Sequence, residues 1–365
     1  MPFPPFPVPI AAARAALAAR SGLLELADRL VPAEAALWDL VAGLQRTNLA
    51  GVLVDSGLAD ALSSGPREPG ELAAELGLSE QVTLRVLGAA SASRLVRMDR
   101  AGRARLTRLG KPLARRHAYS MSAWVGYQSS SSNAKAHMEL GGQLREGAQP
   151  SGHRRAFGNS VWEYFAEHPQ EGARFGEAMR ELTAVDLGAL ARSYPWPRDG
   201  VICDVGGGIG TLLAAILKRR PAARGVLVDA PEVLVEAEDF LRSSGVADRV
   251  QRTPGDMFGA LQAQADVYVL KWILHDWSDE ACREILGRVR ATMPAGSRVV
   301  VIDQHLDPTR PSRISSMVDL LMLVECEGGR ERTPQEVHGL MREAGIEPGS
   351  VRHAGLHMIV EGVAH

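Results

Sequence analysis

The sequence predicts an α/β protein whose C-terminal half forms a mainly parallel, doubly wound sheet of the Rossmann-like kind, preceded by a helical region. Three observations support this prediction. From residue 200 onward, short apolar strand-like runs at 201–205 and 225–229 alternate with helical segments. A glycine-rich turn at 204–210 joins the first strand to its helix. A further apolar strand at 266–270 runs into Lys271-Trp-Ile-Leu-His-Asp-Trp277, so that a histidine follows the end of a strand.

Length and composition limit the possible functions. A chain of 365 residues has room for about two domains. The net charge of −2 provides no overall attraction to nucleic acid. The three cysteines, Cys203, Cys282 and Cys326, are far apart and form no CxxC pair, which argues against a disulfide framework and fits a reducing cytoplasm. The chain has no basic leader and no run of about 18 apolar residues, so we expect neither a secretory signal nor a membrane span.

The pattern along the chain predicts four parts. Residues 1–35 are predicted to form an N-terminal arm followed by an amphipathic helix that needs a partner surface. Residues 36–116 contain a helix, a turn and a second helix with Ser79 as its expected N-cap, followed by a hairpin at 95–107, and this order is typical of a winged-helix domain. Residues 117–196 form a helical region rich in methionine and aromatic residues, and 197–365 form the sheet domain.

The glycine turn indicates a ligand that approaches the backbone closely. Gly206, Gly208 and Gly210 give the spacing GxGxG, and residues without a Cβ permit both sharp turns and close contact. A dinucleotide fingerprint would require glycine where this chain has Thr211, which disfavours a nicotinamide dehydrogenase. By itself the motif is equally typical of a tight strand-to-helix turn.

The acids around this turn make the prediction more specific. Asp204 ends the first strand, and Asp229 ends the second, where a carboxylate can accept both ribose hydroxyls. Further along, Asp256 is a candidate acceptor for an adenine amino group, and Met257 a candidate to pack on the ring face. Each acid alone would more often be a helix cap or a solvated residue. Together, in this order, they favour an adenosine-bearing ligand without pyrophosphate.

His275 is the candidate general base. In an open α/β sheet, ligands gather beyond the carboxyl ends of the strands, and an imidazole with a pKa of about 6.5 can take a proton at neutral pH. Asp276 and Asp279 lie nearby in the sequence, but only His275 and Asp279 would share a helical face. Two ligands make a poor metal site, so we expect no metal.

Taken jointly, the motifs resemble those of the S-adenosylmethionine-dependent small-molecule O-methyltransferases, both the plant caffeate type and its bacterial relatives in aromatic natural-product pathways. The resemblance covers nearly all of the chain after residue 35 and rests on residues 204–210, Asp229, 255–258, 271–280 and 328–333. It implies a Rossmann-like methyltransferase domain with a helical N-terminal winged-helix dimerisation domain. S-adenosylmethionine would be the cofactor, S-adenosylhomocysteine the product, and an aromatic small molecule the substrate. The resemblance further implies a cytoplasmic homodimer in secondary metabolism, including antibiotic biosynthesis.

The resemblance implies roles for individual residues. His275 would remove the proton of the acceptor hydroxyl, and Asp303 and Glu331 would orient its ring. The plant enzymes carry glutamate where this chain has the shorter Asp303. For Glu331 a surface ion pair with Arg330 or Arg332 is the alternative. The cofactor-binding residues would be Asp204, Gly206, Gly208, Asp229, Asp256, Met257 and Lys271.

Four residues are candidates for the acceptor pocket. Phe175, Met179 and Met322 fall where the plant enzymes enclose an aromatic ring, and thioether and ring faces suit a flat apolar ligand. Trp162 is added because it lies in the same aromatic-rich region. Such residues at helical spacing are also typical of a core.

Two other functions remain as alternatives. One is a winged-helix DNA-binding regulator, because the predicted wing carries six arginines between Arg94 and Arg108. Against it, the chain is slightly acidic overall, so we expect no nucleic-acid partner. The other keeps the cofactor but carries out decarboxylation or hydroxylation. The intact His275 favours methyl transfer to an aromatic hydroxyl.

Overall fold

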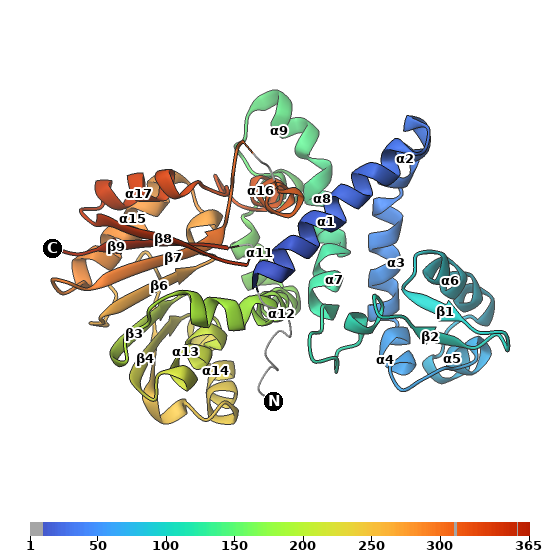
Figure 1. Ribbon diagram of the computed structural model, residues 1–365, viewed down its shortest axis with the longest axis horizontal. Coiled ribbons are helices and arrows are strands. Elements are labelled where there is room, and N and C mark those ends of the chain that lie inside the picture. Colours follow the sequence, from blue (N-terminus) through green and yellow to red (C-terminus); the bar gives the residue numbers. More distant parts are fainter. Residues whose placement is uncertain (1–9, 310–311, 356) are drawn as a thin grey trace. The chain divides into compact units, whose positions relative to one another are not determined.

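The computed structural model describes residues 10–309, 312–355 and 357–365 (Figure 1). The predicted N-terminal arm comprises residues 1–10, and all of it except residue 10 lies outside the described residues. The chain divides into two compact units. We call residues 135–167 and 183–365 the sheet unit, and residues 11–134 and 168–182 the helical unit.

The sheet unit is built on one seven-stranded sheet with the order β5-β4-β3-β6-β7-β9-β8. Its first five strands in this order are parallel, and β9 pairs antiparallel with both β7 and β8. The strands are β3 (Asp199–Val205), β4 (Ala222–Asp229), β5 (Val250–Pro254), β6 (Val267–Lys271), β7 (Arg298–Gln304), β8 (Glu347–Ala354) and β9 (His357–Val363). The predicted mainly parallel α/β fold is therefore confirmed.

Helices cover both faces of this sheet because successive strand residues point to opposite sides. In β6, Tyr268 and Leu270 pack into one apolar cluster with residues of α15 and α17, whereas Val267 and Val269 pack into another with residues of α13 and α14. Figure 1 shows the two helix layers. The helices are α13 (Thr211–Arg219), α14 (Pro231–Ser243), α15 (Asp279–Thr292), α16 (Arg313–Glu325) and α17 (Pro334–Glu343), with 3₁₀ turns η2 (Ala247–Arg249) and η3 (Leu274–Asp276).

The strand order determines where a ligand site forms. From β3 the chain crosses to β4 on one side, and β6 returns to pair with β3 on its other side. This reversal creates a crevice beyond the carboxyl ends of β3 and β6, the usual ligand position in open α/β sheets. The glycine turn and the His275 motif both follow these strand ends.

The helical unit has its own apolar core around Leu53, Leu72 and Leu87. The predicted helix-turn-helix and hairpin are confirmed: Gly77, with a φ of 66°, ends α5, and β1 pairs antiparallel with β2. Ser79 holds the N-cap position of α6, but its side chain makes no capping bond there. The elements are α1 (Ile10–Arg29), α2 (Ala33–Val41), α3 (Gly43–Asp55), α4 (Leu58–Leu62), α5 (Pro69–Leu76), α6 (Glu80–Ala92), β1 (Val96–Met98), β2 (Ala104–Leu106), η1 (Lys111–Leu113) and α7 (Ser122–Gln128).

The region predicted to be helical after residue 117 is helical in the structure. After α7 it contains α8 (Ser131–Met138), α9 (Leu140–Glu146), α10 (Gly152–Phe157), α11 (Val161–Glu167) and α12 (Pro169–Ser193). Over the described part of the chain, none of the helices combines the length and the apolar character that crossing a membrane requires.

Candidate functional site

The glycine turn after β3 needs glycine for conformation and for space. Gly206 has a φ of 67°, and a Cβ there would lie 2.5 Å from Cδ1 of Ile273. Gly208 has a φ of 59°, but a Cβ there would meet no atom within 4 Å. Both residues adopt backbone angles that L side chains rarely adopt. At Gly208 the turn therefore borders open space on the side where a Cβ would lie.

Asp229 and Asp204 hold this turn from two sides. The Asp229 carboxylate accepts hydrogen bonds from the backbone N–H of Gly208 (2.7 Å) and of Ala230 (2.8 Å). Burial raises its pKa. Each of its oxygens keeps a lone pair that a ribose hydroxyl can use. Asp204 is buried beneath the turn, its Cγ 2.6 Å from where a Cβ on Gly207 would lie, and burial raises its pKa to about 7.

The segment after β5 adds one polar and one apolar candidate. Asp256 is exposed, and its Oδ1 accepts a hydrogen bond from the backbone N–H of Phe258 (3.1 Å). The methyl group of Met257 would lie 3.6 Å from a Cβ on Gly206, so Met257 lies beside the glycine turn. The Phe258 ring meets Trp277 edge to face, with centroids 4.8 Å apart. This contact joins the segment to the His275 motif.

Lys271 is the last residue of β6 and is partly buried. Its ammonium donates a hydrogen bond to Oγ1 of Thr183 (2.8 Å) and lies 3.2 Å from the centre of the Trp272 ring. Burial lowers the pKa of Lys271 to about 7, against the opposing effect of Asp204 and Asp303. Trp272 has a φ of 56°, a strained value for a bulky residue, of the kind that concentrates at functional sites.

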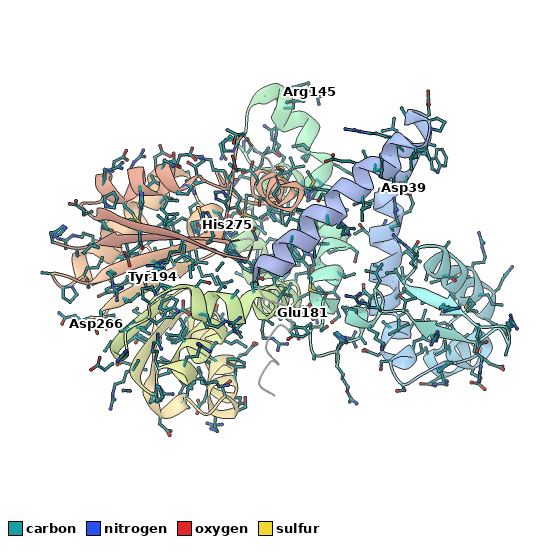
Figure 2. All side chains as sticks on the ribbon, viewed as in Figure 1. Asp39, Arg145, Glu181, Tyr194, Asp266 and His275 are labelled. Atoms are coloured by element: carbon teal, nitrogen blue, oxygen red, sulfur yellow. The ribbon has the colours of Figure 1, made fainter. Side chains whose placement is uncertain are left out.

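His275 lies in η3, directly beyond β6 and Trp272, and is labelled in Figure 2. Its ring is buried, with Nδ1 2.7 Å from Oε1 of Glu331 and Nε2 3.4 Å from Oδ1 of Asp276. Burial raises the pKa of both Glu331 and Asp276. When Glu331 is ionised, it can only accept, so the ring proton lies on Nδ1 and Nε2 keeps its lone pair.

Asp303 does not make the direct contact that the resemblance implied. It ends β7 as expected and is buried, but no hydrogen bond or ion pair joins it to His275 within the described residues. Its Oδ1 has no hydrogen-bond partner there. Burial raises its pKa to about 6, with the charge of His275 opposing. Aspartate is one methylene shorter than the glutamate of the plant enzymes, which accounts for the missing bond.

The four candidates for the acceptor pocket divide between the two units. In the sheet unit, Met322 is buried in α16, and Trp162 of α11 stacks on Trp277 with centroids 6.1 Å apart. Phe175 and Met179 belong to the helical-unit part of α12, where the Phe175 ring meets Tyr127 edge to face. For all four, the role in an acceptor pocket stays a prediction.

Several residues at the site were not predicted to act there. Asp276 faces Nε2 of His275 and accepts a hydrogen bond from the Cys326 thiol (3.6 Å). Asp319 accepts the backbone N–H of Glu331 (2.8 Å). The Thr183 hydroxyl accepts a hydrogen bond from Lys271, which lies 88 residues further along the sequence. Only Asp276 had a sequence signal, its position next to the histidine, because the other partners come from distant helices.

The Asp279 carboxylate forms ion pairs with two arginines and none with His275 in the described structure. It binds Arg330 (3.2 Å) and Arg332 (2.7 Å). Within the described ranges, no three His, Cys, Asp or Glu side chains gather as metal ligands would.

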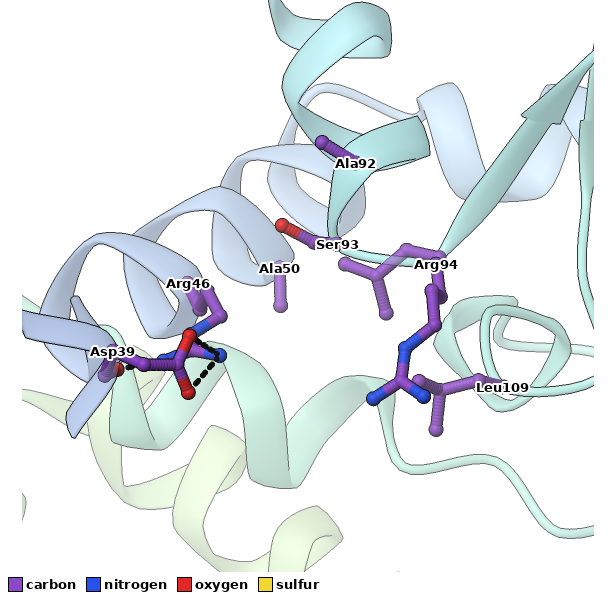
Figure 3. Close-up of a pocket in the computed structure, with 8 residues that line it drawn as sticks. Asp39, Arg46, Ala50, Ala92, Ser93, Arg94 and Leu109 are labelled. Carbon is purple, nitrogen blue, oxygen red and sulfur yellow. Dashed lines mark hydrogen bonds and ion pairs between the residues drawn. The ribbon is translucent and has the colours of Figure 1, made fainter. Parts of the chain in front are cut away.

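A pocket of about 410 Å³ lies in the helical unit between Asp39, Arg46 and Arg94 (Figure 3). None of the predicted site residues lines it.

Known proteins resemble this chain over most of its length. The sequence model of the O-methyltransferase domain matches residues 137–347. O-demethylpuromycin-O-methyltransferase of Streptomyces alboniger is 36% identical over 300 residues, which cover 81% of this chain and 79% of that protein. Mitomycin biosynthesis 6-O-methyltransferase of Streptomyces lavendulae is 32% identical over 317 residues, covering 86% of this chain and 89% of that protein.

A solved structure extends the likeness to bound ligands. The O-methyltransferase NcsB1 from neocarzinostatin biosynthesis was crystallised with S-adenosyl-L-homocysteine and 1,4-dihydroxy-2-naphthoic acid. It superposes on this chain with a TM-score of 0.77 at 28% identity, over 90% of this chain and 98% of its own.

Proposed function

Because the chain belongs to the S-adenosylmethionine-dependent O-methyltransferases, we propose that it methylates an aromatic hydroxyl with His275 as general base. The observation that carries this proposal is the His275–Glu331 pair, which leaves Nε2 available as a base beyond the end of β6. S-adenosylmethionine is the cofactor of this family, and its sulfonium supplies the methyl group. Relatives that act in puromycin, mitomycin and neocarzinostatin pathways support a natural-product acceptor.

The residues at the strand ends fit S-adenosylmethionine. Asp229 offers both carboxylate oxygens to a ribose, and the open space at Gly208 leaves room beside the backbone. Met257 beside the turn suits the adenine face, and Asp256 its amino group. We assign cofactor binding to these residues together with Gly206, Asp204 and Lys271. Asp204 supports the turn from below.

In the proposed reaction the protein positions the acceptor and removes one proton. A phenol has a pKa of about 10, so it is mostly un-ionised at neutral pH and benefits from a nearby base. As the acceptor oxygen takes the methyl group, its proton passes to Nε2 of His275. Glu331, in its ionised form, accepts a hydrogen bond from the Nδ1 proton and stabilises the imidazolium that forms. Asp303 acts on this charge through space.

We further propose that the protein is a homodimer joined through its N-terminal helices. Apolar side chains lie exposed along α2 and at the start of α3, including Leu37, Trp38, Leu40 and Leu44. A dense group of exposed apolar side chains is typical of protein–protein interfaces. The winged-helix region would then be a dimerisation domain.

The proposed reaction is tested by a screen and one substitution. Phenolic acceptors are incubated with S-adenosylmethionine, and products are read as mass gains of one methyl group. His275→Ala should lower kcat by at least about 100-fold, the usual contribution of a general base. Calorimetry should show S-adenosylhomocysteine affinity within about twofold of wild type, because the ring lies on the acceptor side.

His365→Ala is the matched control, since this histidine is exposed at the C-terminus. It should retain wild-type turnover. Full activity of His275→Ala would refute the base assignment.

A further inference from the structure

Arg332 is a buried arginine beside His275 that the proposed reaction does not use. Its side chain is 2% exposed, and a buried guanidinium is tolerated only when its charge and its N–H donors are satisfied. Nε and Nη2 donate to Oδ1 of Asp279, at 2.9 and 2.7 Å. Nη1 donates to the carbonyl of Leu274 (2.5 Å), and Nη2 also donates to the carbonyl of Trp277 (2.7 Å).

These two carbonyls lie on either side of the proposed base. Leu274 directly precedes His275, and Trp277 follows Asp276. Ser278 then caps α15 by accepting the backbone N–H of Ala281, and Asp279 is the first residue of that helix. One guanidinium therefore ties both ends of the His275 turn to the start of a helix. Fixing the peptide groups around a residue fixes the direction in which its side chain leaves the backbone.

The chain segment that carries Arg332 also holds His275 in two other ways. The backbone N–H of Arg330 donates to the carbonyl of His275 (2.8 Å), and Glu331 bonds its Nδ1. The packing is close, because a Cβ on Gly329 would lie 2.9 Å from the His275 carbonyl oxygen. Three consecutive residues thus contact the His275 turn: Arg330 and Arg332 bond its backbone carbonyls, and Glu331 bonds the His275 ring.

We propose that Arg332 is a positioning residue for His275, its guanidinium anchored on Asp279 and clamped to the carbonyls of Leu274 and Trp277. This inference rests on the proposed role of His275 as base. An arginine suits the task because its planar fork serves several acceptors at fixed angles, whereas a lysine ammonium is a single point donor. Arg332 acts through the turn and touches neither reactant.

The test compares a buried arginine with an exposed one. Arg332→Lys keeps the charge but cannot reach Asp279 and both carbonyls together. We expect kcat to fall by about 10- to 100-fold, the cost of a misplaced catalytic group, with S-adenosylhomocysteine affinity within about twofold of wild type. Arg288→Lys is the control: Arg288 lies in α15, the helix that Asp279 begins, but it is 50% exposed and pairs with Glu284 one helical turn away (3.2 Å). Its kcat should change by less than about twofold.

Acceptor acidity separates positioning from general damage. If Arg332 acts by placing the base, the kcat defect of Arg332→Lys should shrink toward unity with a phenol that is already ionised at the assay pH. A structural defect would lower turnover equally for acidic and ordinary phenols, and that result would overturn the proposal. So would wild-type kcat with ordinary phenols.

Two further variants make the outcome unambiguous. His275→Ala is assayed on the same phenols, and full activity of this variant would refute the proposed function. If His275→Ala is defective while Arg332→Lys has wild-type kcat, only the positioning role of Arg332 is refuted. Asp279→Asn removes the anchor of Arg332 while leaving the arginine in place. It should show the same acceptor-dependent defect, and it decides the question if Arg332→Lys does not fold, as judged by urea unfolding.

Discussion

At the scale of single residues, three acids lie near the His275 ring: Glu331 and Asp303 are buried, and Asp276 is partly buried. Glu331 lies 2.7 Å from Nδ1, and Asp276 lies 3.4 Å from Nε2. Asp303 bonds neither nitrogen in the described structure. Only Glu331 can therefore select the ring tautomer, because that choice is made by the hydrogen bond on the other nitrogen. Asp303 can act only through its charge.

This difference predicts unequal effects of two conservative substitutions. Glu331→Gln removes the charge and allows the amide N–H to face Nδ1, which favours the tautomer that cannot act as base. We expect kcat at saturating substrates to fall by at least about tenfold, part of the range that general base catalysis contributes. Asp303→Asn should cost less than Glu331→Gln, because it removes a charge that bonds neither ring nitrogen. An equal or larger loss for Asp303→Asn would mean that Asp303 contacts the ring during the reaction.

The resemblance predicted the contact between Glu331 and the ring, but it also implied one from Asp303 that is not formed, and it did not predict what holds the turn. His275 and Glu331 were both found from the resemblance, and the structure pairs them. Arg332 was considered only as a surface partner of Glu331, yet it is buried and binds Asp279 instead. Thr183 had no signal at all. Such partners depend on contacts between segments 53 and 88 residues apart, which no local pattern records.

At the scale of elements, periodicity predicted the pieces but not their pairing. The strands at 201–205 and 225–229 were located to within a few residues, since apolar runs and turns bound them, and the helix expected after the glycine turn is α13. The position of β9 between β7 and β8 was not predictable, because antiparallel pairing across the end of the chain leaves no local mark. The prediction of the site did not depend on this pairing, because the site lies at the ends of β3, β4 and β6.

Helix α16 provides a pH-dependent prediction. Burial raises the pKa of Glu325 to about 8, whereas an unfolded glutamate has a pKa of about 4.3. Between these values the folded chain keeps a proton that the unfolded chain has lost, so this group lowers the free energy of unfolding as pH rises. Glu325→Gln removes the effect. We expect its stability gain over wild type to grow by a few kcal/mol, on the order of 1.4 per pKa unit, between pH 5 and pH 8.

Urea unfolding at both pH values measures this gain. Glu238→Gln is the control, because Arg252 lowers the pKa of this exposed glutamate and it stays ionised in both states over that range. Its effect should be the same at pH 5 and pH 8. A gain for Glu325→Gln that does not change with pH would contradict the assignment of a buried, neutral Glu325.

At the scale of the whole molecule, exposed apolar surface is concentrated in one part of the sequence. More than half of the large apolar side chains that are exposed in the described structure lie between residues 23 and 52 of the helical unit. Most of the rest occur singly along the chain. Single exposed apolar residues are normal in folded proteins, but a dense group indicates an interface. The proposed homodimer would bury this surface and explain why the amphipathic first helix needs a partner.

Trp38 is the sharpest probe of that interface. Its side chain is 80% exposed in α2, so replacing it should leave the fold of one chain intact, while tryptophans often dominate binding energy at interfaces. Trp38→Glu should convert the dimer to a monomer at micromolar concentration, measured by sedimentation over a range of concentrations. The matched control is Val235→Glu, which places the same charge on a 72% exposed position of α14 in the sheet unit and should leave the dimer unchanged. If the wild type is monomeric throughout, or if Trp38→Glu dimerises as well as Val235→Glu, the N-terminal helices are not the dimer interface.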